Sequence, residues 1–270
     1  HSNRFVILNP PPEPASVKDL DHIHSLGYER DVHPFYRKQG EVRALDTIRF
    51  SIVTHYGCYG ECSFCAIAVH QGRRVQSRSE TAIVREAEQV SMLPDFKGYI
   101  TDLSGPTANM YGYECARKLK KGACPDRRCL FPQACPGLKP DHSKLIRLIR
   151  RIESLPRIKK VFLASGIRHD LVMADQQHGS AFIQKLVADN VSGQLKLAPE
   201  PSPKAVLDLM GKPGTQSLVD FKHQFDDLSE KMGKKQFLTY YLMAAHPGCT
   251  PESMQALARF ARQTLKTRPR

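Results

Sequence analysis

Short apolar runs alternate with segments of helical period along most of the chain. Apolar and β-branched runs bounded by glycine, proline or asparagine predict strands at residues 4–8, 47–54, 98–103, 160–164, 194–198 and 236–244. Helical periodicity follows the later strands, within residues 80–93, 141–152, 179–189, 218–232 and 251–265. The first of these helices is predicted to begin at a capping box formed by Ser77 and Glu80, and Thr250 precedes a first-turn proline at the last.

This alternation predicts an α/β fold, in which parallel strands are joined by right-handed crossovers. We expect a curved parallel sheet or partial barrel with functional residues at the carboxyl ends of its strands. A flat, doubly wound sheet is the alternative, but no G-x-G-x-x-G fingerprint follows the first strand. Residues 47–270 are predicted to form the core, with a Cys-rich insertion at 110–140 after the second strand.

The N-terminal part differs from the rest of the chain. Residues 1–46 contain several prolines and little periodicity, which predicts a connector and the tail of a missing N-terminal domain. The first residue is His1 rather than Met, so we expect the chain to be a piece of a longer protein. No run approaches the roughly 20 consecutive apolar residues that a membrane-spanning helix requires.

Three cysteines stand in one short loop directly after the strand predicted at 47–54. Cys58, Cys62 and Cys65 have the spacing Cys-x3-Cys-x2-Cys. Three thiolates so placed can hold three irons of a cubic 4Fe-4S cluster and leave the fourth iron open to a substrate or cofactor. The alternative is a structural zinc ion with His55 or His70 as the fourth ligand. Eight cysteines without a secretory signal favour a reducing cytoplasm over disulfides.

Several other segments give the chain a family resemblance. It resembles the YgiQ-type radical S-adenosylmethionine (SAM) family in residues 63–67, 70–73, 77–79, 105–111, 165–171 and 198–200. The resemblance implies a (β/α)6-type partial barrel, here truncated before its last strand. It also implies a 4Fe-4S cluster at Cys58, Cys62 and Cys65, and SAM cleaved by one electron to a 5'-deoxyadenosyl radical. A reductant such as flavodoxin or ferredoxin is then an expected partner.

The resemblance also implies a SAM pocket. The turn after the second strand usually carries Gly-Gly-Glu and receives the SAM amino group, but this chain has Ser104, Gly105 and Pro106 there and no glutamate. Backbone carbonyls or Thr107 are the expected substitutes. The other residues assigned to SAM are Phe64 and His246 for the adenine, Ser165 and Arg168 for the ribose or carboxylate, and Glu200 for the ribose.

Each of these assignments has a plainer alternative. Arg168 suits a carboxylate because its planar fork pairs bidentately, but it can equally form a loop ion pair with Asp170. His246 can be a residue at a helix start with no ligand role. Lys212, in a Gly- and Pro-containing loop, is interpreted as an exposed lysine rather than a phosphate contact.

Four further cysteines lie in the predicted insertion. Cys115, Cys124, Cys129 and Cys135 are spaced x8, x4 and x5. They are candidates for a second metal centre, either an auxiliary 4Fe-4S cluster or an all-thiolate zinc site. The alternative is that one or more are ordinary free thiols, with Cys115 the first to be left out. Cys249 is interpreted as unpaired and inert.

The charge balance adds one expectation about partners. The formal net charge is +13 and the pI is about 9.4, with much of the excess at 117–128 and 139–160. A basic balance fits a nucleic acid or another polyanion, although absent acidic parts of the chain would also explain it. The sequence therefore predicts a radical SAM enzyme whose substrate is unknown, with RNA as the first expectation. The alternatives are a cobalamin-assisted radical SAM methyltransferase and a non-catalytic, metal-stabilised nucleic-acid-binding module.

Overall fold

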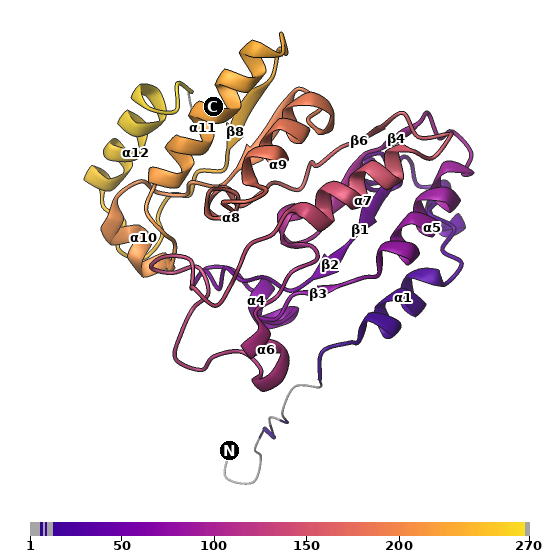
Figure 1. Ribbon diagram of the computed structural model, residues 1–270, viewed down its shortest axis with the longest axis horizontal. Helices are drawn as coiled ribbons and strands as arrows, with labels where there is room; N and C mark the ends of the chain where they lie inside the picture. The colour runs from indigo at the N-terminus through magenta and orange to yellow at the C-terminus, as the bar shows by residue number, and fades with distance from the viewer. Residues whose placement is uncertain (1–5, 8, 10–12, 268–270) are drawn as a thin grey trace.

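The computed structural model describes residues 6, 7, 9 and 13–267 as an alternation of short strands and helices (Figure 1). This alternation confirms the α/β class. The strands are β1 (Ser51–Val53), β2 (His55–Tyr56), β3 (Gln76–Ser77), β4 (Tyr99–Ile100), β5 (Asp102–Ser104), β6 (Lys160–Val161), β7 (Gln194–Leu197) and β8 (Phe237–Tyr240).

The long-range strand pairs are parallel. β1 pairs with β5, β4 with β6, and β7 with β8. Backbone hydrogen bonds extend the first two pairs into one ladder, because Leu103 N donates to Phe162 O and Thr101 N donates to Phe50 O. β2 and β3 form a short antiparallel pair. The sequence pattern did not predict this pair, since two-residue strands are too short to show a period of two.

The longer helices contact one another in chain order. α5 contacts α7, α7 contacts α9, and α9 contacts α11. In the part of the chain that the structure describes, no helix is long and apolar enough to cross a membrane. The helices are α1 (Val17–Ser25), α2 (Pro34–Arg37), α3 (Ala44–Ile48), α4 (Ile67–His70), α5 (Glu80–Ser91), α6 (Ala116–Lys121), α7 (Ser143–Glu153), α8 (His169–Ala174), α9 (Gly179–Lys185), α10 (Lys204–Met210), α11 (Gln216–Lys231) and α12 (Pro251–Gln263), with a 3-10 turn η1 (Ala108–Met110) and a π turn η2 (Leu186–Asn190).

The main core lies between the strands and these helices. Ile52, Leu103, Val161 and Leu195 on the strands have no exposed surface. Each such side chain contributes about 1.5–3 kcal/mol by burial. Because successive strand residues point to opposite faces, the neighbouring Asp102, Ser104 and Lys196 face the other side of the sheet. That side therefore carries polar groups.

Strand boundaries differ from the sequence prediction: β6, β7 and β8 are shorter than predicted, and the three earlier strands also differ. The strand predicted from residue 47 begins only at Ser51, because residues 44–48 form the helix α3. The strand predicted at 98–103 is divided at Thr101 into β4 and β5. The strand predicted at 4–8 lies mostly outside the described residues, and Val6 and Ile7 are not in a strand.

Helix starts were predicted in part. The Thr250 cap is confirmed, because its side chain accepts a hydrogen bond from Ser253 N at 3.2 Å. The capping box at Ser77 and Glu80 is wrong: Ser77 belongs to β3, and Ser79 caps α5 by accepting from Ala82 N. Ser77, two residues before the actual cap, thus stood three residues before Glu80 and imitated a capping box.

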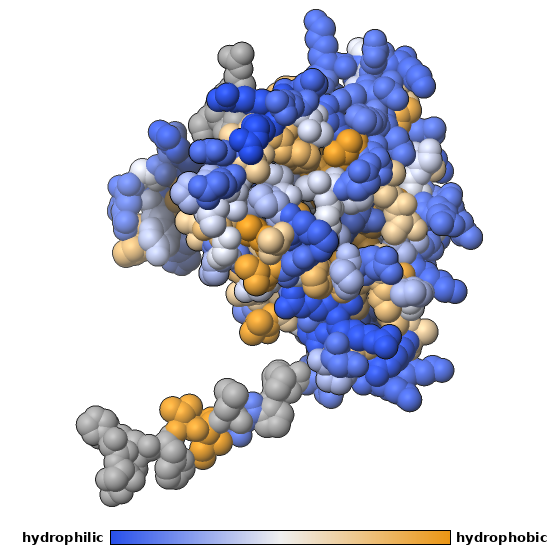
Figure 2. Space-filling view, turned by 90° about the vertical axis from the view of Figure 1, so that its left-hand side faces the viewer, coloured by the Kyte–Doolittle hydropathy of each residue, from blue (hydrophilic) through white to orange (hydrophobic). Residues whose placement is uncertain are grey.

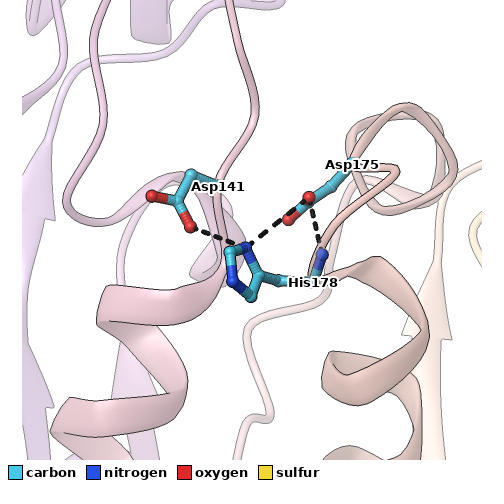
Figure 3. Close-up of side chains that lie close together, drawn as sticks. All are labelled: Asp141, Asp175 and His178. Atoms are coloured by element: carbon cyan, nitrogen blue, oxygen red, sulfur yellow. Dashed lines mark hydrogen bonds and ion pairs between the residues drawn. The ribbon is translucent and has the colours of Figure 1, made fainter.

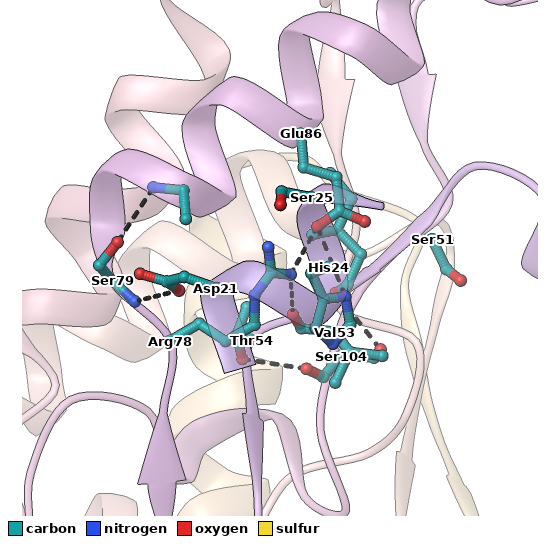
Figure 4. A network of polar contacts seen from close by, with 12 residues as sticks. Asp21, His24, Ser25, Ser51, Val53, Thr54, Arg78, Ser79, Glu86 and Ser104 are labelled. Atoms are coloured by element: carbon teal, nitrogen blue, oxygen red, sulfur yellow. Dashed lines mark hydrogen bonds and ion pairs between the residues drawn. The ribbon is translucent and has the colours of Figure 1, made fainter. Parts of the chain in front are cut away.

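A buried ionic network fastens α1 to α5 and the sheet (Figure 4). Glu86, only 5% exposed, accepts hydrogen bonds from the guanidinium groups of Arg30 and Arg78. Arg78 also donates to Val53 O at 2.7 Å, and Asp21 accepts from Ser79 N at 3.0 Å. The N-terminal helix is therefore attached directly to the strand that leads to the cysteine loop.

Candidate functional site

The cysteine loop is held in place at its start. It leaves β2 at Gly57, whose φ of +85° lies in the region that favours glycine. A Cβ at this position would lie 2.3 Å from Arg74 O, so only glycine fits. Cys58 N then donates to Gly72 O at 3.2 Å. The loop is thus packed against the backbone of residues 72–74.

Two of the cysteine sulfurs and one arginine converge on Gly60. A Cβ on Gly60 would lie 3.3 Å from Cys58 Sγ, 3.5 Å from Cys62 Sγ and 3.1 Å from Arg168 Nη1. Burial raises the pKa of the Cys58 thiol, while the Gly60 amide and Arg168 act to lower it and the neighbouring thiols of Cys62 and Cys65 raise it further. The loop therefore gathers thiols next to a cation.

The arrangement of the three sulfurs does not match a single zinc ion. Among the described residues, Cys58, Cys62 and Cys65 do not all lie within 4.8 Å of one another. A zinc ion with Zn–S bonds of about 2.3 Å needs them closer than this. A 4Fe-4S cluster spreads its thiolates over separate irons and needs a wider spacing. The three sulfurs are therefore not gathered as a single zinc ion would require.

The histidines proposed as fourth zinc ligands do not fit that role. His55 is fully buried, with Nδ1 2.8 Å from Thr54 Oγ1 and Nε2 3.0 Å from Thr107 O. Both ring nitrogens are therefore occupied by protein, and burial lowers the pKa of His55 to about 4. His70 is exposed at the end of α4. In this structure His55 therefore has no ring nitrogen free for a zinc ion.

Arg168 forms the ion pair that was the plainer alternative for it. Its Nε donates to Asp170 Oδ1 at 2.8 Å, and its Nη2 donates to Asp170 Oδ2. The two side chains are only 13% and 11% exposed. Burial opposes both charges, but each partner stabilises the other, so the pKa of Arg168 is raised and that of Asp170 is lowered. The remaining nitrogen, Nη1, lies 4.0 Å from Cys62 Sγ.

A buried chain of hydrogen bonds fixes the backbone of Arg168. Asn109 accepts from Arg168 N at 2.8 Å and donates to Arg168 O at 3.0 Å. Its amide also lies 3.1 Å from His142 Nε2, and His142 Nδ1 lies 2.8 Å from Asp175 Oδ2. Asn109 and His142 have no exposed surface. The sequence singled out neither residue for this role, since nothing in the spacing links positions 109, 142, 168 and 175.

Asp175 also meets a surface pair, Asp141 and His178 (Figure 3). The three side chains offer ligand atoms within 4.8 Å of one another. However, the Asp175 carboxylate already accepts from the backbone amides of His142, Gln177 and His178 and faces the His142 ring. A carboxylate has about four acceptor positions, so none is left for a metal ion. These hydrogen bonds and the Asp141–His178 ion pair account for the close approach of the three side chains.

Glu200 and Lys212 form a second buried pair near the cysteine loop. Lys212 is 8% exposed, so its interpretation as an exposed loop lysine is wrong. Its Nζ donates to Ala198 O at 2.5 Å and to Glu200 Oε1 at 3.2 Å. Burial lowers the pKa of Lys212, and nearby Arg168 adds to the effect. Arg168, Lys212 and Pro199 line one small pocket, of about 30 Å³.

Phe64 and His246 are brought together from distant parts of the sequence. Their ring centroids are 6.2 Å apart, with the rings nearly perpendicular. Phe64 is 39% exposed, and Leu209 on α10 is 57% exposed. Ser63, next to Phe64, fastens the loop to α10 by donating to Met210 O and Leu209 O. Figure 2 shows apolar side chains scattered among hydrophilic ones on the face that carries α10 and α12.

The turn after β5 is occupied by protein contacts. Ser104 O accepts from Thr54 N and Thr54 Oγ1, and a Cβ on Gly105 would lie 2.2 Å from the His55 ring. Gly105 is therefore required by packing against His55. Thr107 accepts from His55 through its backbone oxygen, and Pro106 is half-buried. No hydrogen bond or ion pair links these turn residues to the cysteine loop within the described parts of the chain.

Ser165 lies with an acidic residue that the sequence analysis did not single out. Asp102, at the start of β5, accepts from Ala164 N at 2.8 Å and Ser165 N at 3.2 Å, and from the Ser165 hydroxyl. Asp102 lies inside the strand predicted at 98–103 rather than after its carboxyl end, so its position gave no signal. It joins two neighbouring strands on the polar side of the sheet.

Three of the four cysteines at 115–135 belong to one small apolar cluster, in which Cys129 is buried and against which Cys115 and Cys135 pack. Cys115 and Cys135 both approach Gly137, where a Cβ would lie 3.6 and 3.8 Å from their sulfurs. Cys124 Sγ accepts from Arg117, and Cys129 is buried near Lys118, with burial raising the pKa of its thiol. Among the described residues, no three of these sulfurs lie within 4.8 Å of one another.

Lys118 ties the segment 113–118 to the cysteine loop. It is 2% exposed and lies 4.6 Å from the ring centroid of Tyr59, which stands between Cys58 and Gly60. Its Nζ donates to Arg73 O at 2.6 Å and lies 3.6 Å from Glu114. The Tyr59 hydroxyl donates to Tyr113 O. A buried lysine inside a basic run was not distinguishable by sequence from its exposed neighbours.

Comparisons with known proteins match the N-terminal part of the chain and, separately, nearly its whole length. The family described as Radical SAM N-terminal matches residues 1–51. A UPF0313 protein of Fusobacterium nucleatum is 51% identical over 267 residues, or 99% of this chain and 47% of that protein. The chain is therefore similar to radical SAM proteins in its N-terminal part and to UPF0313 proteins along nearly its whole length.

Other relatives match nearly the whole chain as well. A UPF0313 protein of Clostridium perfringens is 46% identical over 97% of the chain, and one of Methanosarcina mazei is 44% identical over 97%. These matches cover 39% and 41% of the two proteins. The chain thus spans about half or less of the length of the curated relatives it matches.

Proposed function

We propose that this chain binds a 4Fe-4S cluster through Cys58, Cys62 and Cys65 and takes part in reductive cleavage of SAM. The observation that carries the proposal is the convergence of Cys58 and Cys62 on Gly60 beside Arg168, in a chain that is similar to radical SAM proteins in its N-terminal part. Among the described residues the three sulfurs do not all lie within 4.8 Å of one another, which does not favour a single zinc ion. When bound, such a cluster supplies one electron to SAM at its open iron, releasing a 5'-deoxyadenosyl radical.

The remaining side chains hold and shield the reactants in this proposal. Phe64 and His246, whose rings already meet, take the adenine. Ser104, Gly105, Pro106 and Thr107 border the position of the SAM amino group, and Ser165 and Glu200 are assigned to the ribose. Because Glu200 is paired with Lys212, that pair has to open or share its oxygens. A closed pocket around the reactants excludes water and oxygen.

We also propose that the strands form a partial (β/α)6-type barrel. The ladder through β1, β4, β5 and β6 and the parallel pair β7–β8 fit a sheet whose order follows the sequence. Leu163 N donates to Asn190 O, which connects the two parts just before β7. The polar side of this sheet would then be the barrel interior.

RNA is the substrate that the charge distribution favours. Arg117, Lys120, Lys121 and Arg127 are exposed, and in the part of the chain described by the structure none of them forms an ion pair. They lie near the cysteine loop, because Arg73 donates to both Glu61 in that loop and Arg127 O. A cobalamin-assisted methyl transfer is the alternative reaction, and a non-catalytic nucleic-acid-binding module is the alternative class. The cytoplasm, with flavodoxin or ferredoxin as reductant, suits thiolate ligands.

One experiment tests the central proposal. The chain is reconstituted anaerobically with iron and sulfide, and then incubated with dithionite and SAM. We expect about four irons per chain and the formation of 5'-deoxyadenosine. A colourless protein that retains zinc, binds RNA with strong salt dependence and forms no 5'-deoxyadenosine would instead identify the binding module.

A further inference from the structure

Arg168 has one guanidinium nitrogen that its ion pair does not use. Nε and Nη2 donate to the two carboxylate oxygens of Asp170. Nη1 points the other way, 4.0 Å from Cys62 Sγ and next to the position at Gly60 that Cys58 Sγ also borders. The guanidinium group therefore lies between a carboxylate on one side and two thiols on the other.

This geometry leaves Arg168 one edge fewer with which to hold a free carboxylate. Bidentate recognition of a carboxylate uses two parallel N–H groups on one edge of the guanidinium. In Arg168 the edge formed by Nε and Nη2 is already taken by Asp170. The Nη1/Nη2 edge remains open, and on it Arg168 offers a positive charge and the N–H groups of Nη1, which lie beside the sulfurs.

The backbone around Arg168 is held more tightly than a loop ion pair requires. Asn109 uses its oxygen and its amide group on the two backbone polar groups of Arg168, and His142 and Asp175 fix Asn109 in turn. All three supporting side chains are at most 2% exposed. Networks of this kind orient groups around metal ligands and tune the metal they hold.

We propose that Arg168 is a positioning residue for the cluster thiolates, which raises the reduction potential of the cluster through its charge and through hydrogen bonds from Nη1 to Cys62 and Cys58. This inference rests on the proposed cluster. Hydrogen bonds to sulfur and nearby charge are among the factors that set cluster potentials. A cation next to the thiolates stabilises the more negative, reduced state, so its removal should make reduction harder.

The test is an anaerobic redox titration of the reconstituted protein, followed by electron paramagnetic resonance. In Arg168→Gln we expect a midpoint potential more negative than in the wild type at equal iron content. Arg168→Lys keeps the charge and should recover part of the shift. The matched control is Arg147→Gln, which removes an exposed arginine paired with Glu80, and it should leave the midpoint unchanged.

A second variant guards against misfolding. Arg168→Gln leaves Asp170 buried without its partner, whereas Arg168→Gln combined with Asp170→Asn removes both charges and keeps two hydrogen-bonding amides. We expect the same direction of shift in this double variant. An unchanged midpoint potential in both variants would overturn the proposal. If the SAM-induced spectral change were lost as well, the result would assign Arg168 to SAM binding instead. A wild-type protein that takes up no cluster would contradict the proposed function itself, and the inference with it.

Discussion

The cysteine loop at 57–65 and the segment 115–135 carry similar numbers of thiols in different surroundings. In the loop, two sulfurs border one glycine and share a cation delivered by a distant strand end. In the segment, Cys124 lies with Arg117, and Cys115, Cys129 and Cys135 pack in one apolar cluster near Lys118, where no arginine lies opposite their sulfurs among the described residues. Cysteine density is thus a poor guide to a site. What distinguishes the loop is the guanidinium group of Arg168, which the fold places beside the sulfurs.

The largest expected effect comes from removing one thiol of the loop. Cys62→Ala should abolish both iron uptake and 5'-deoxyadenosine formation, because a cluster with two protein ligands is not retained. Iron per chain and visible absorbance measure the first effect, and chromatography of the nucleoside measures the second. Cys249→Ala is the control and should resemble the wild type. Survival of the brown chromophore in Cys62→Ala would mean that other thiols bind the iron.

The next effect tests how firmly the two regions are connected. Lys118→Met removes a buried cation that contacts Tyr59, Arg73 and Glu114. It should lower the free energy of unfolding by about 3 kcal/mol, because Glu114 is left buried without its partner. Urea denaturation measures this change. Lys121→Met, an exposed lysine on the same helix, should cost less than about 0.5 kcal/mol, and equal losses in both variants would refute the connection.

Acid should affect the cysteine loop through the histidine beneath it. Burial lowers the pKa of His55 to about 4, so between pH 6.5 and 4 the unfolded chain binds more protons than the folded one. The contribution of neutral His55 to the free energy of unfolding is therefore complete above pH 6.5. It falls by up to about 3 kcal/mol as the pH decreases to 4. Urea denaturation at several pH values should show a shallower fall in His55→Gln than in His70→Gln, whose histidine is exposed. Equal slopes would show that His55 does not titrate as described.

A matched pair of glycine substitutions compares the two regions directly. Gly60→Ala places a Cβ 3.1–3.5 Å from Arg168 Nη1 and two sulfurs, whereas Gly137→Ala places one at 3.6–3.8 Å from Cys115 and Cys135. We expect Gly60→Ala to cost about 1–3 kcal/mol through overpacking and to lower iron occupancy. Gly137→Ala should change neither quantity. A larger iron loss in Gly137→Ala than in Gly60→Ala would reverse the comparison.

The smallest effect is expected from the second set of thiols. Cys124→Ala combined with Cys129→Ala should leave iron and zinc per chain unchanged, because Cys124 faces Arg117 and lies outside the cluster that holds Cys115, Cys129 and Cys135. Elemental analysis of the reconstituted protein measures both metals. A drop in either metal would establish the second metal centre that the spacing predicts, and would require the four thiols to move together on binding.

Much of the fold could be predicted from the sequence, since apolar periodicity reports directly which residues are buried. The stripe on α7 and the strand residues Ile52 and Leu103 are examples. The failures are local. Helix α3 replaced the start of a predicted strand, and Ser79 rather than Ser77 caps α5. At these points the sequence offers two local choices of similar free energy, and tertiary contacts decide between them.

The candidate site was predictable only for side chains whose chemistry shows in a motif. The cysteine spacing located the loop, and the family resemblance placed Phe64 and His246 in one pocket, where the structure also has them together. Buried polar partners were not visible. Lys212 was interpreted as exposed, and Asn109, His142 and Lys118 were not recognised, because a polar residue has the same letter whether or not the fold supplies its partner.

The contact between Lys118 and Tyr59 has a consequence for local unfolding. Since Tyr59 stands between Cys58 and Gly60, and its hydroxyl donates to Tyr113 O, the segment 113–118 cannot separate from the body of the protein without uncovering the cysteine loop. The two segments should therefore form one cooperative unit in amide hydrogen exchange. Opening of this unit would expose the thiols to oxygen. The contacts of Lys118, which is far from the cysteines of the loop in sequence, should therefore slow the oxidation of the loop in air.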